Sequence, residues 1–284
     1  MRGQLEAGEV SFWLNGQPAS ARAGQTVLQA AKAQGVSIHC ACYRDGLGGD
    51  ASCRVCLVEI AGEPRLAPAC HRTPTEGMAV HTDSEKVQRV RRTVLQFLDA
   101  EAVGPIDPLT EFGRLLPKKD PAEISEGTSV PDDSHPAIIV DRDACILCGR
   151  CVRACRDVQC NDVIGIGYRG TETRIIFDTD TTLGDSSCVG CGECVQACPT
   201  HALRDRSAEE NRGAERAVET VCPYCGVGCQ LRYEVRDGRI VAATGLNGPS
   251  NQRRLCVKGR YGFDYVHHPH RRTQPLIRRE DVPK

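Results

Sequence analysis

Apolar and polar positions near the start of the chain predict a hairpin followed by a short helix. Residues 10–14 read Val-Ser-Phe-Trp-Leu, and the Asn-Gly pair at 15–16 is typical of a tight turn between antiparallel strands. Residues 26–35 read Thr-Val-Leu-Gln-Ala-Ala-Lys-Ala-Gln-Gly, which predicts a helix that ends at Gly35. The run Leu-Val-Glu-Ile at 57–60 predicts another strand. We therefore expect a small α+β domain here.

Farther along the chain, apolar residues recur at helical spacing and predict an amphipathic helix over 84–100. Val87, Val90, Val94 and Phe97 follow at helical spacing, and Asp83 is the expected N-cap. The polar, proline-rich stretch 117–136 reads as a linker, and 204–219 reads as a charged connector. Near the other end, 230–235 and 239–243 predict two strands around an Asp-Gly turn.

Composition points to metal clusters as part of the folding energy. The 284 residues include 18 cysteines and only 4% aromatic residues, so each domain has little bulky apolar material for a core. A net charge of −1 gives no electrostatic case for a nucleic-acid or membrane partner. No signal peptide or membrane helix is apparent, and a cytoplasmic protein is expected.

Two copies of one cysteine pattern lie at the centre of the chain. Residues 145–155 and 188–198 both read C-x2-C-x2-C-x3-C, the run of two-cluster ferredoxins, in which the fourth cysteine ligates the other cluster. Crossed ligation predicts one [4Fe-4S] set of Cys145, Cys148, Cys151 and Cys198, and a second set of Cys188, Cys191, Cys194 and Cys155. Gly149, Gly190 and Gly192 would let the backbone approach the sulfides. A zinc site or a disulfide knot is the alternative.

The first four spaced cysteines suit a smaller cluster. Cys42, Cys53, Cys56 and Cys70 come from one long loop and the end of a later strand, which fits the two ligands that each iron of a [2Fe-2S] rhomb needs. Cys40 and Cys160 are left over, and we expect a free thiol at Cys40 and a buried free thiol at Cys160.

The last cysteine group can hold a further cubane. Cys222, Cys225, Cys229 and Cys256 are spaced C-x2-C-x3-C-x26-C, for which a zinc site is again the alternative. The stretch Gly165 to Gly170 also matches G-x-G-x-x-G. A strand soon follows it where a dinucleotide fold needs a helix, so we expect a hairpin turn.

Residues 10–82 resemble the β-grasp [2Fe-2S] domain at the start of the complex I large subunit and of related formate dehydrogenase and hydrogenase subunits. Cys42-Tyr43, the run from Ser52 to Ile60, and Pro68-Ala-Cys-His71 carry the resemblance. In that family a [4Fe-4S] site with one histidine and three cysteines follows the helix. Here neither residue type occurs between Asp99 and Pro117, so that cluster is predicted to be absent.

Cys-Pro-Tyr-Cys-Gly-Val-Gly-Cys with Cys-Val-Lys-Gly resembles the cluster domain of molybdenum or tungsten bis-molybdopterin-guanine-dinucleotide enzymes, most closely formate dehydrogenases. The resemblance implies an electron-relay role for Lys258 between cluster and pterin, and cluster contacts at Gly226 and Gly228. It also implies that the Mo or W centre and its catalytic residues lie beyond residue 284.

The expected architecture is an α+β multidomain chain. It comprises a β-grasp [2Fe-2S] domain (8–82), a helix and linker (83–136), a two-cluster ferredoxin-type domain (137–206), a small β-rich [4Fe-4S] domain of the molybdopterin oxidoreductase type (215–271), and the start of a catalytic body (272–284).

The expected function is the iron-sulfur electron-transfer portion of a formate dehydrogenase, an oxidoreductase component with one [2Fe-2S] and three [4Fe-4S] clusters. The resemblance implies two partners, a molybdopterin catalytic domain or subunit and a flavin- and NAD-binding diaphorase subunit. A hydrogenase diaphorase or complex I-like subunit is one alternative, and a zinc-stabilised binding module is another.

Overall fold

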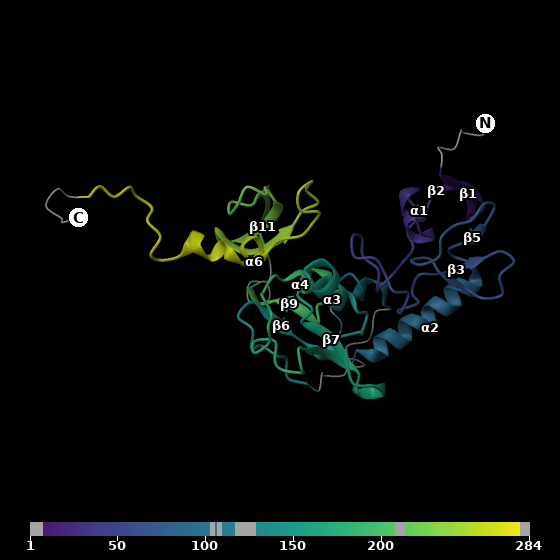
Figure 1. The fold of residues 1–284 in the computed structure, drawn as a ribbon, viewed down its shortest axis with the longest axis horizontal. Coiled ribbons are helices and arrows are strands. Elements are labelled where there is room, and N and C mark those ends of the chain that lie inside the picture. The colour runs from purple at the N-terminus through teal and green to yellow at the C-terminus, as the bar shows by residue number, and fades with distance from the viewer. Residues whose placement is uncertain (1–7, 103–105, 107–109, 117–128, 208–213, 279–284) are drawn as a thin grey trace. The chain divides into compact units, whose positions relative to one another are not determined.

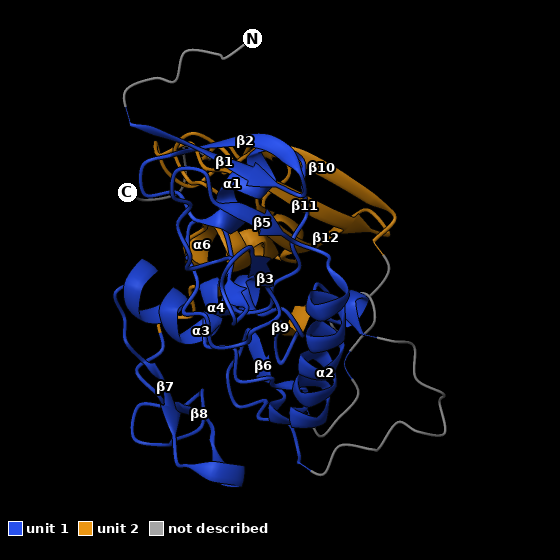
Figure 2. Ribbon diagram, turned by 90° about the vertical axis from the view of Figure 1, so that its right-hand side faces the viewer, with its two compact units in different colours: residues 1–188, 193–204 blue, residues 189–192, 205–284 orange. Residues whose placement is uncertain are grey.

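The computed structural model describes residues 8–102, 106, 110–116, 129–207 and 214–278 (Figure 1). The chain divides into two compact units, coloured separately in Figure 2. The first contains residues 1–188 and 193–204, and the second contains residues 189–192 and 205–284. Within the described residues, no helix is both long and apolar enough to cross a membrane.

The first unit begins with a five-stranded mixed sheet in the order β2-β1-β5-β3-β4. Its strands are β1 (Glu9–Leu14), β2 (Gln17–Arg22), β3 (Leu57–Ile60), β4 (Ala67–Pro68) and β5 (Ala79–His81). β1 and β2 form the predicted hairpin, and β5 runs parallel to β1. The predicted helix is α1 (Val27–Ala33), which Thr26 and Gln29 begin with a capping box.

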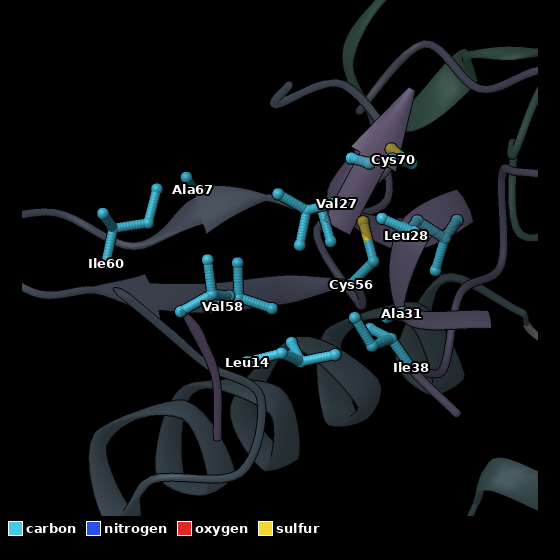
Figure 3. Close-up of a cluster of buried hydrophobic side chains, with 14 of the residues drawn as sticks. Leu14, Val27, Leu28, Ala31, Ile38, Cys56, Val58, Ile60, Ala67 and Cys70 are labelled. Carbon is cyan, nitrogen blue, oxygen red and sulfur yellow. The ribbon is translucent and has the colours of Figure 1, made fainter. Parts of the chain in front are cut away.

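The side chains between α1 and this sheet form an apolar core. Nineteen buried residues belong to it, and Figure 3 shows the sulfur atoms of Cys56 and Cys70 at the same end of the core as Val27 and Leu28. Burial of apolar surface on this scale stabilises the domain. The same core fixes two of the spaced cysteines in place.

The second predicted helix is α2 (Glu85–Glu101). The prediction that Asp83 caps it is wrong by one residue: the hydroxyl of Ser84 accepts the N–H of Val87 at 3.3 Å. Asp83 instead accepts hydrogen bonds from Gln88 and Arg91 farther along the helix. Most of the expected linker, 117–128, lies outside the described residues.

Short elements frame the two ferredoxin-type repeats. β6 (Ile138–Val140) pairs with β9 (Leu203–Asp205), and β7 (Ile164–Gly167) pairs with β8 (Arg174–Phe177). The expected hairpin at 165–170 is confirmed, although Gly165–Gly167 belong to β7 and the turn itself continues through η5 (Gly170–Glu172). The remaining elements are η1 (Gly113–Leu115), η3 (Arg142–Ala144), α3 (Arg150–Arg153), η4 (Ala154–Val158) and α4 (Glu193–Ala197).

The second unit contains a three-stranded antiparallel sheet of β10 (Arg216–Val221), β11 (Gln230–Arg236) and β12 (Arg239–Gly245). The two predicted strands correspond to β11 and β12. β10 corrects the expectation of a connector over 204–219, because backbone pairing with β11 makes a strand of a charged sequence. α6 (Val257–Tyr261) and η6 (Gly262–His267) follow the sheet.

Candidate metal centres

The first candidate centre brings together the four cysteines spaced for a [2Fe-2S] cluster. Cys42, Cys53, Cys56 and Cys70 are all buried. The Cys42 N–H donates to the Cys53 sulfur at 3.3 Å, and the backbone N–H of Ala69 donates to the Cys56 carbonyl at 3.0 Å. The long loop and the β4 end therefore meet at one place.

The side chains of all four cysteines of this centre lie close enough to shift one another's pKa. Contacts with Cys53 and Cys70 lower the pKa of Cys42, and contact with Cys70 lowers the pKa of Cys56. The same contacts raise the pKa values of Cys53 and Cys70. Such mutual contact among four sulfur atoms fits a small cluster that takes two thiolates on each iron.

Two residues beside this centre, Gly49 and Cys40, are not candidate ligands. At Gly49 a Cβ atom would lie 3.4 Å from the Cys70 sulfur and 3.1 Å from the Tyr43 Cβ, so a larger residue would crowd the loop beside this ligand. Cys40 is partly buried and packs against the apolar core, and burial raises its thiol pKa to about 12. A protonated thiol fits the free cysteine expected there.

The second candidate centre is the first crossed set. Cys145, Cys148, Cys151 and Cys198 line a single cavity, together with apolar side chains such as Ile146, Ile175 and Leu203. Burial raises the pKa of Cys145 to about 11 and that of Cys148 to about 12, and the Cys198 sulfur adds to both shifts. The cysteine from the second repeat thus lies with three from the first.

The third candidate centre is the second crossed set. Cys155 lies in η4 and Cys194 in α4, two elements that pack against each other in the first unit. Cys188 ends the first unit's main segment, whereas Cys191 and Gly190 belong to the segment 189–192 of the second unit. The η4–α4 packing is the structural feature that favours crossing at this centre.

The fourth candidate centre lies in the second unit. The sulfur atoms of Cys222, Cys225 and Cys256 add to the burial that raises the pKa of Cys229, which places the four thiols near one another. The Cys222 N–H donates to the Cys229 carbonyl at 2.8 Å and closes the loop. At Gly259 a Cβ would lie 3.4 Å from the Cys222 sulfur.

The other predicted site residues of this unit are open to solvent. Lys258 lies on α6, two residues after Cys256, and its side chain is exposed. Cβ atoms added at Gly226 and Gly228 would meet no described atom within 4 Å. Within the described residues, nothing covers the Lys258 side chain or fills the space beside the two glycines.

The prediction of a buried thiol at Cys160 is wrong. Cys160 is exposed, and it lies just after η4 in a left-handed conformation with φ of 57°. Apolar packing is the usual reason that free cysteines are buried, and the turn that ends η4 leaves this residue outside such packing.

Sequence reasoning missed the arginines that surround the candidate ligands. Arg150 and Arg153 on α3 donate to the backbone carbonyls of Tyr43 and Cys42, respectively, which lie more than 100 residues earlier. In the second unit, Arg260 Nε donates to the Cys191 carbonyl at 3.0 Å. The only local signal was the placement of two arginines three residues apart between ligand cysteines.

An apolar cluster connects the first two centres. Cys42, Cys53 and Cys148 belong to it, together with Ile146 and Phe112. Val94, Leu95 and Leu98 of α2 pack against the same cluster. No three His, Cys, Asp or Glu side chains in the described part of the chain are placed to hold a single metal ion, whereas four thiols around a cavity suit a multi-iron cluster.

Comparison with known families agrees with this geometry. Residues 7–85 match the 2Fe-2S iron-sulfur cluster binding domain, residues 144–202 match the 4Fe-4S dicluster domain, and residues 215–268 match the molybdopterin oxidoreductase Fe4S4 domain. The fold and the cysteine sets therefore define an iron-sulfur electron-transfer protein of the oxidoreductase class.

Individual relatives define the family. The α subunit of an NADPH-Fe(3+) oxidoreductase from Geobacter sulfurreducens is 32% identical over 95% of this chain and 33% of its own length. A subunit of an NADH-quinone oxidoreductase from Rhizobium meliloti is 33% identical over the same shares. The crystal structure of an NAD+-reducing [NiFe]-hydrogenase matches with a TM-score of 0.60 and 30% identity, covering 70% of this chain and 88% of that chain.

The chain belongs to the family of N-terminal iron-sulfur portions shared by formate dehydrogenase α subunits, the complex I large subunit and NAD-reducing hydrogenases. It spans about a third of the length of the curated relatives that it matches.

Proposed function

We propose that this chain is the electron-conducting portion of a formate dehydrogenase that transfers electrons from formate toward a flavin- and NAD-binding partner. Bound clusters would supply one-electron carriers along the chain. The chain's own residues would hold those carriers in series, with one [2Fe-2S] set and three [4Fe-4S] sets among the 16 spaced cysteines. A molybdopterin domain or subunit would supply the reaction with formate.

One observation carries this proposal: the cysteines of the fourth centre lie in a segment whose sequence matches a domain of molybdopterin oxidoreductases. The four thiols of Cys222, Cys225, Cys229 and Cys256 lie in a segment that matches the molybdopterin oxidoreductase Fe4S4 domain. Lys258 follows the last of them and is exposed, so it is accessible to a molybdopterin body outside the described chain. We propose that Lys258 relays electrons between that body and the fourth cluster.

The apolar cluster between the first two centres supports a direct route from one to the other. It contains two candidate [2Fe-2S] ligands and Cys148 of the first crossed set. In the family that this chain resembles, the segment after α2 carries a histidine-ligated cluster. In this chain, the same segment contributes Phe112, Leu115 and Leu116 to the apolar packing instead. We therefore propose that electrons pass between these two centres without an intermediate histidine-ligated cluster.

A second candidate is the corresponding subunit of an NAD(P)H-oxidising complex. The relatives named for NADPH and NADH oxidation are 32% and 33% identical to this chain, whereas a putative formate dehydrogenase from Staphylococcus haemolyticus is 26% identical over 90% of it. Both candidates require the same conductor, and they differ in the electron donor.

Two measurements test the proposal. The anaerobically purified chain should contain about 14 irons, the sum for one [2Fe-2S] and three [4Fe-4S] clusters; zinc with negligible iron would refute the conductor. In extracts of the source cells, deletion of this coding segment should abolish formate-dependent NAD+ reduction. If only an NAD(P)H-dependent activity is lost, the second candidate is correct. The purified chain alone should not oxidise formate.

A further inference from the structure

A partly buried arginine at the boundary between the first two centres touches a candidate ligand residue. Arg153 of α3, whose side chain is 11% exposed, donates to the backbone carbonyl of Cys42. Its other Nη atom forms an ion pair with Asp50 at 2.8 Å. Cys42 is a candidate [2Fe-2S] ligand, and α3 lies between the ligands Cys148 and Cys155 of the dicluster region. Arg153 thus belongs to one cluster region and contacts the other.

Its neighbour Arg150 fixes the position of α3. The Arg150 side chain is 0% exposed, donates to the Tyr43 carbonyl, and forms a fork of two bonds to Glu111 at 2.8 and 2.9 Å. A planar guanidinium that makes two parallel bonds holds its partners in a defined geometry. Arg150 therefore holds α3 against the [2Fe-2S] loop, and Arg153 is placed one helical turn farther on.

Both arginines also have a buried donor that lacks an acceptor within the described part of the chain. The Nε–H groups of Arg150 and Arg153 are buried and have no acceptor among the described residues. A buried donor without an acceptor costs free energy, so such groups normally have a partner. The thiolate and sulfide sulfur atoms of a bound cluster would be acceptors of the right charge for such donors.

The second unit contains a similar contact between an arginine and the carbonyl of a ligand cysteine. Arg260 is 1% exposed and donates to the carbonyl of Cys191, a candidate ligand of the third centre. Arg260 lies four residues after Cys256, a candidate ligand of the fourth centre. In this unit too, a buried arginine donates to the backbone carbonyl of a candidate ligand cysteine.

We propose that Arg153 is a positioning residue that raises the reduction potential of the [2Fe-2S] cluster, because it contacts the backbone carbonyl of the candidate ligand Cys42. The proposal rests on the proposed electron-transfer function. Reduction adds a negative charge to a cluster, and a fixed guanidinium in a poorly hydrated boundary favours the reduced form. A hydrogen bond to the ligand carbonyl acts in the same direction.

The pair Arg153 and Asp50 permits a test in which the two variants act with opposite sign. Arg153→Gln removes the positive charge and should lower the [2Fe-2S] midpoint potential, decreasing the ratio of reduced to oxidised cluster at a fixed potential roughly tenfold, or about 59 mV for a one-electron couple. Asp50→Asn removes the negative charge beside the guanidinium and should raise the potential. Arg153→Lys keeps the charge and should restore part of the loss.

The measurement is a redox titration of the full chain with intact clusters, followed by the electron paramagnetic resonance signal of the reduced [2Fe-2S] cluster. Arg156→Gln is the matched control, because Arg156 also lies near α3 but is exposed and paired with Asp157. Its potential should equal that of the wild type.

The outcomes separate the two proposals. If the wild-type chain shows no [2Fe-2S] signal, the proposed function fails. If the signal is present and Arg153→Gln and Asp50→Asn leave the potential unchanged, or shift it in the same direction, the role of Arg153 is refuted. If Arg153→Gln prevents cluster assembly, Asp50→Asn and Arg153→Lys still decide the matter through the sign of their shifts.

Discussion

At Gly192 the chain needs a residue without a side chain for two separate reasons. Its backbone is left-handed, with φ of 70°, and an added Cβ would overlap the Cδ of Arg260 and the hydroxyl of Tyr261. Arg260 must occupy that space to reach the Cys191 carbonyl. The absence of a Cβ at one residue therefore determines whether an arginine can contact a neighbouring ligand.

We predict that Gly192→Ala destabilises the second unit by about 3 kcal/mol, from left-handed strain plus overpacking. Gly238→Ala is the matched control, because Gly238 has the same φ of 70° but nothing within 4 Å of a Cβ. It should cost only about 1 kcal/mol. Urea denaturation of both variants measures the difference. Equal losses would show that the Arg260 contact does not depend on the free space at Gly192.

The ferredoxin-type repeats show how short elements determine which cysteines share a centre. α3 packs against α4, and Cys198 follows α4 directly while the other three cysteines of its set flank or lie on α3. For the first set, this packing brings Cys198 to the cavity that Cys145, Cys148 and Cys151 line. We therefore expect helix packing, and not cysteine spacing alone, to produce crossed ligation.

Pairs of substitutions test the crossing by iron content. Cys145→Ala with Cys198→Ala should remove ligands of one centre only and lower the iron content by about four per chain. Cys145→Ala with Cys155→Ala should disturb both centres and lower it by about eight. Iron analysis of the two double variants, purified in parallel, makes the comparison. The reverse order would mean that each repeat holds its own cluster.

The elements that sequence predicted are those with local signals. The β1–β2 hairpin has an Asn-Gly turn, and α1 has its own capping box, so neither needs distant contacts. β10 has no such signal: it is exposed along its whole length and exists because β11 pairs with it. The choice of Ser84 over Asp83 as the cap of α2 was likewise undecided locally, because both residues are good N-caps.

Over the whole molecule, cysteine spacing predicted the candidate centres, and long-range contacts supplied what spacing could not. The repeat pattern anticipated that Cys198 lies with Cys145, and the cavity they share agrees. Arg153 contacts Cys42, which lies more than 100 residues earlier in the chain, and Phe112 packs in the apolar cluster between the first two centres. No periodic pattern in the sequence predicts either contact. Such contacts depend on how separately folded segments pack.

The two units differ in how much apolar core they possess, which predicts different responses to cluster removal. The sheet of the first unit has a core of nineteen buried residues, whereas the described part of the second unit buries only seven apolar side chains, among them Leu231, Val241 and Phe263. A domain with so small a core depends on metal binding for much of its folding free energy. Loss of the clusters should therefore unfold the second unit first.

Hydrogen exchange followed by mass spectrometry measures this difference. After iron is removed with a chelator under reducing conditions, backbone amides of β11 and β12 should lose nearly all protection, while those of β1 and β2 should retain much of theirs. The hairpin of the first unit is the internal control, because both regions experience the same chelator in the same sample. Equal loss of protection in both sheets would mean that the apolar core around α1 cannot fold without its cluster, and that the fold of the whole chain depends on metal.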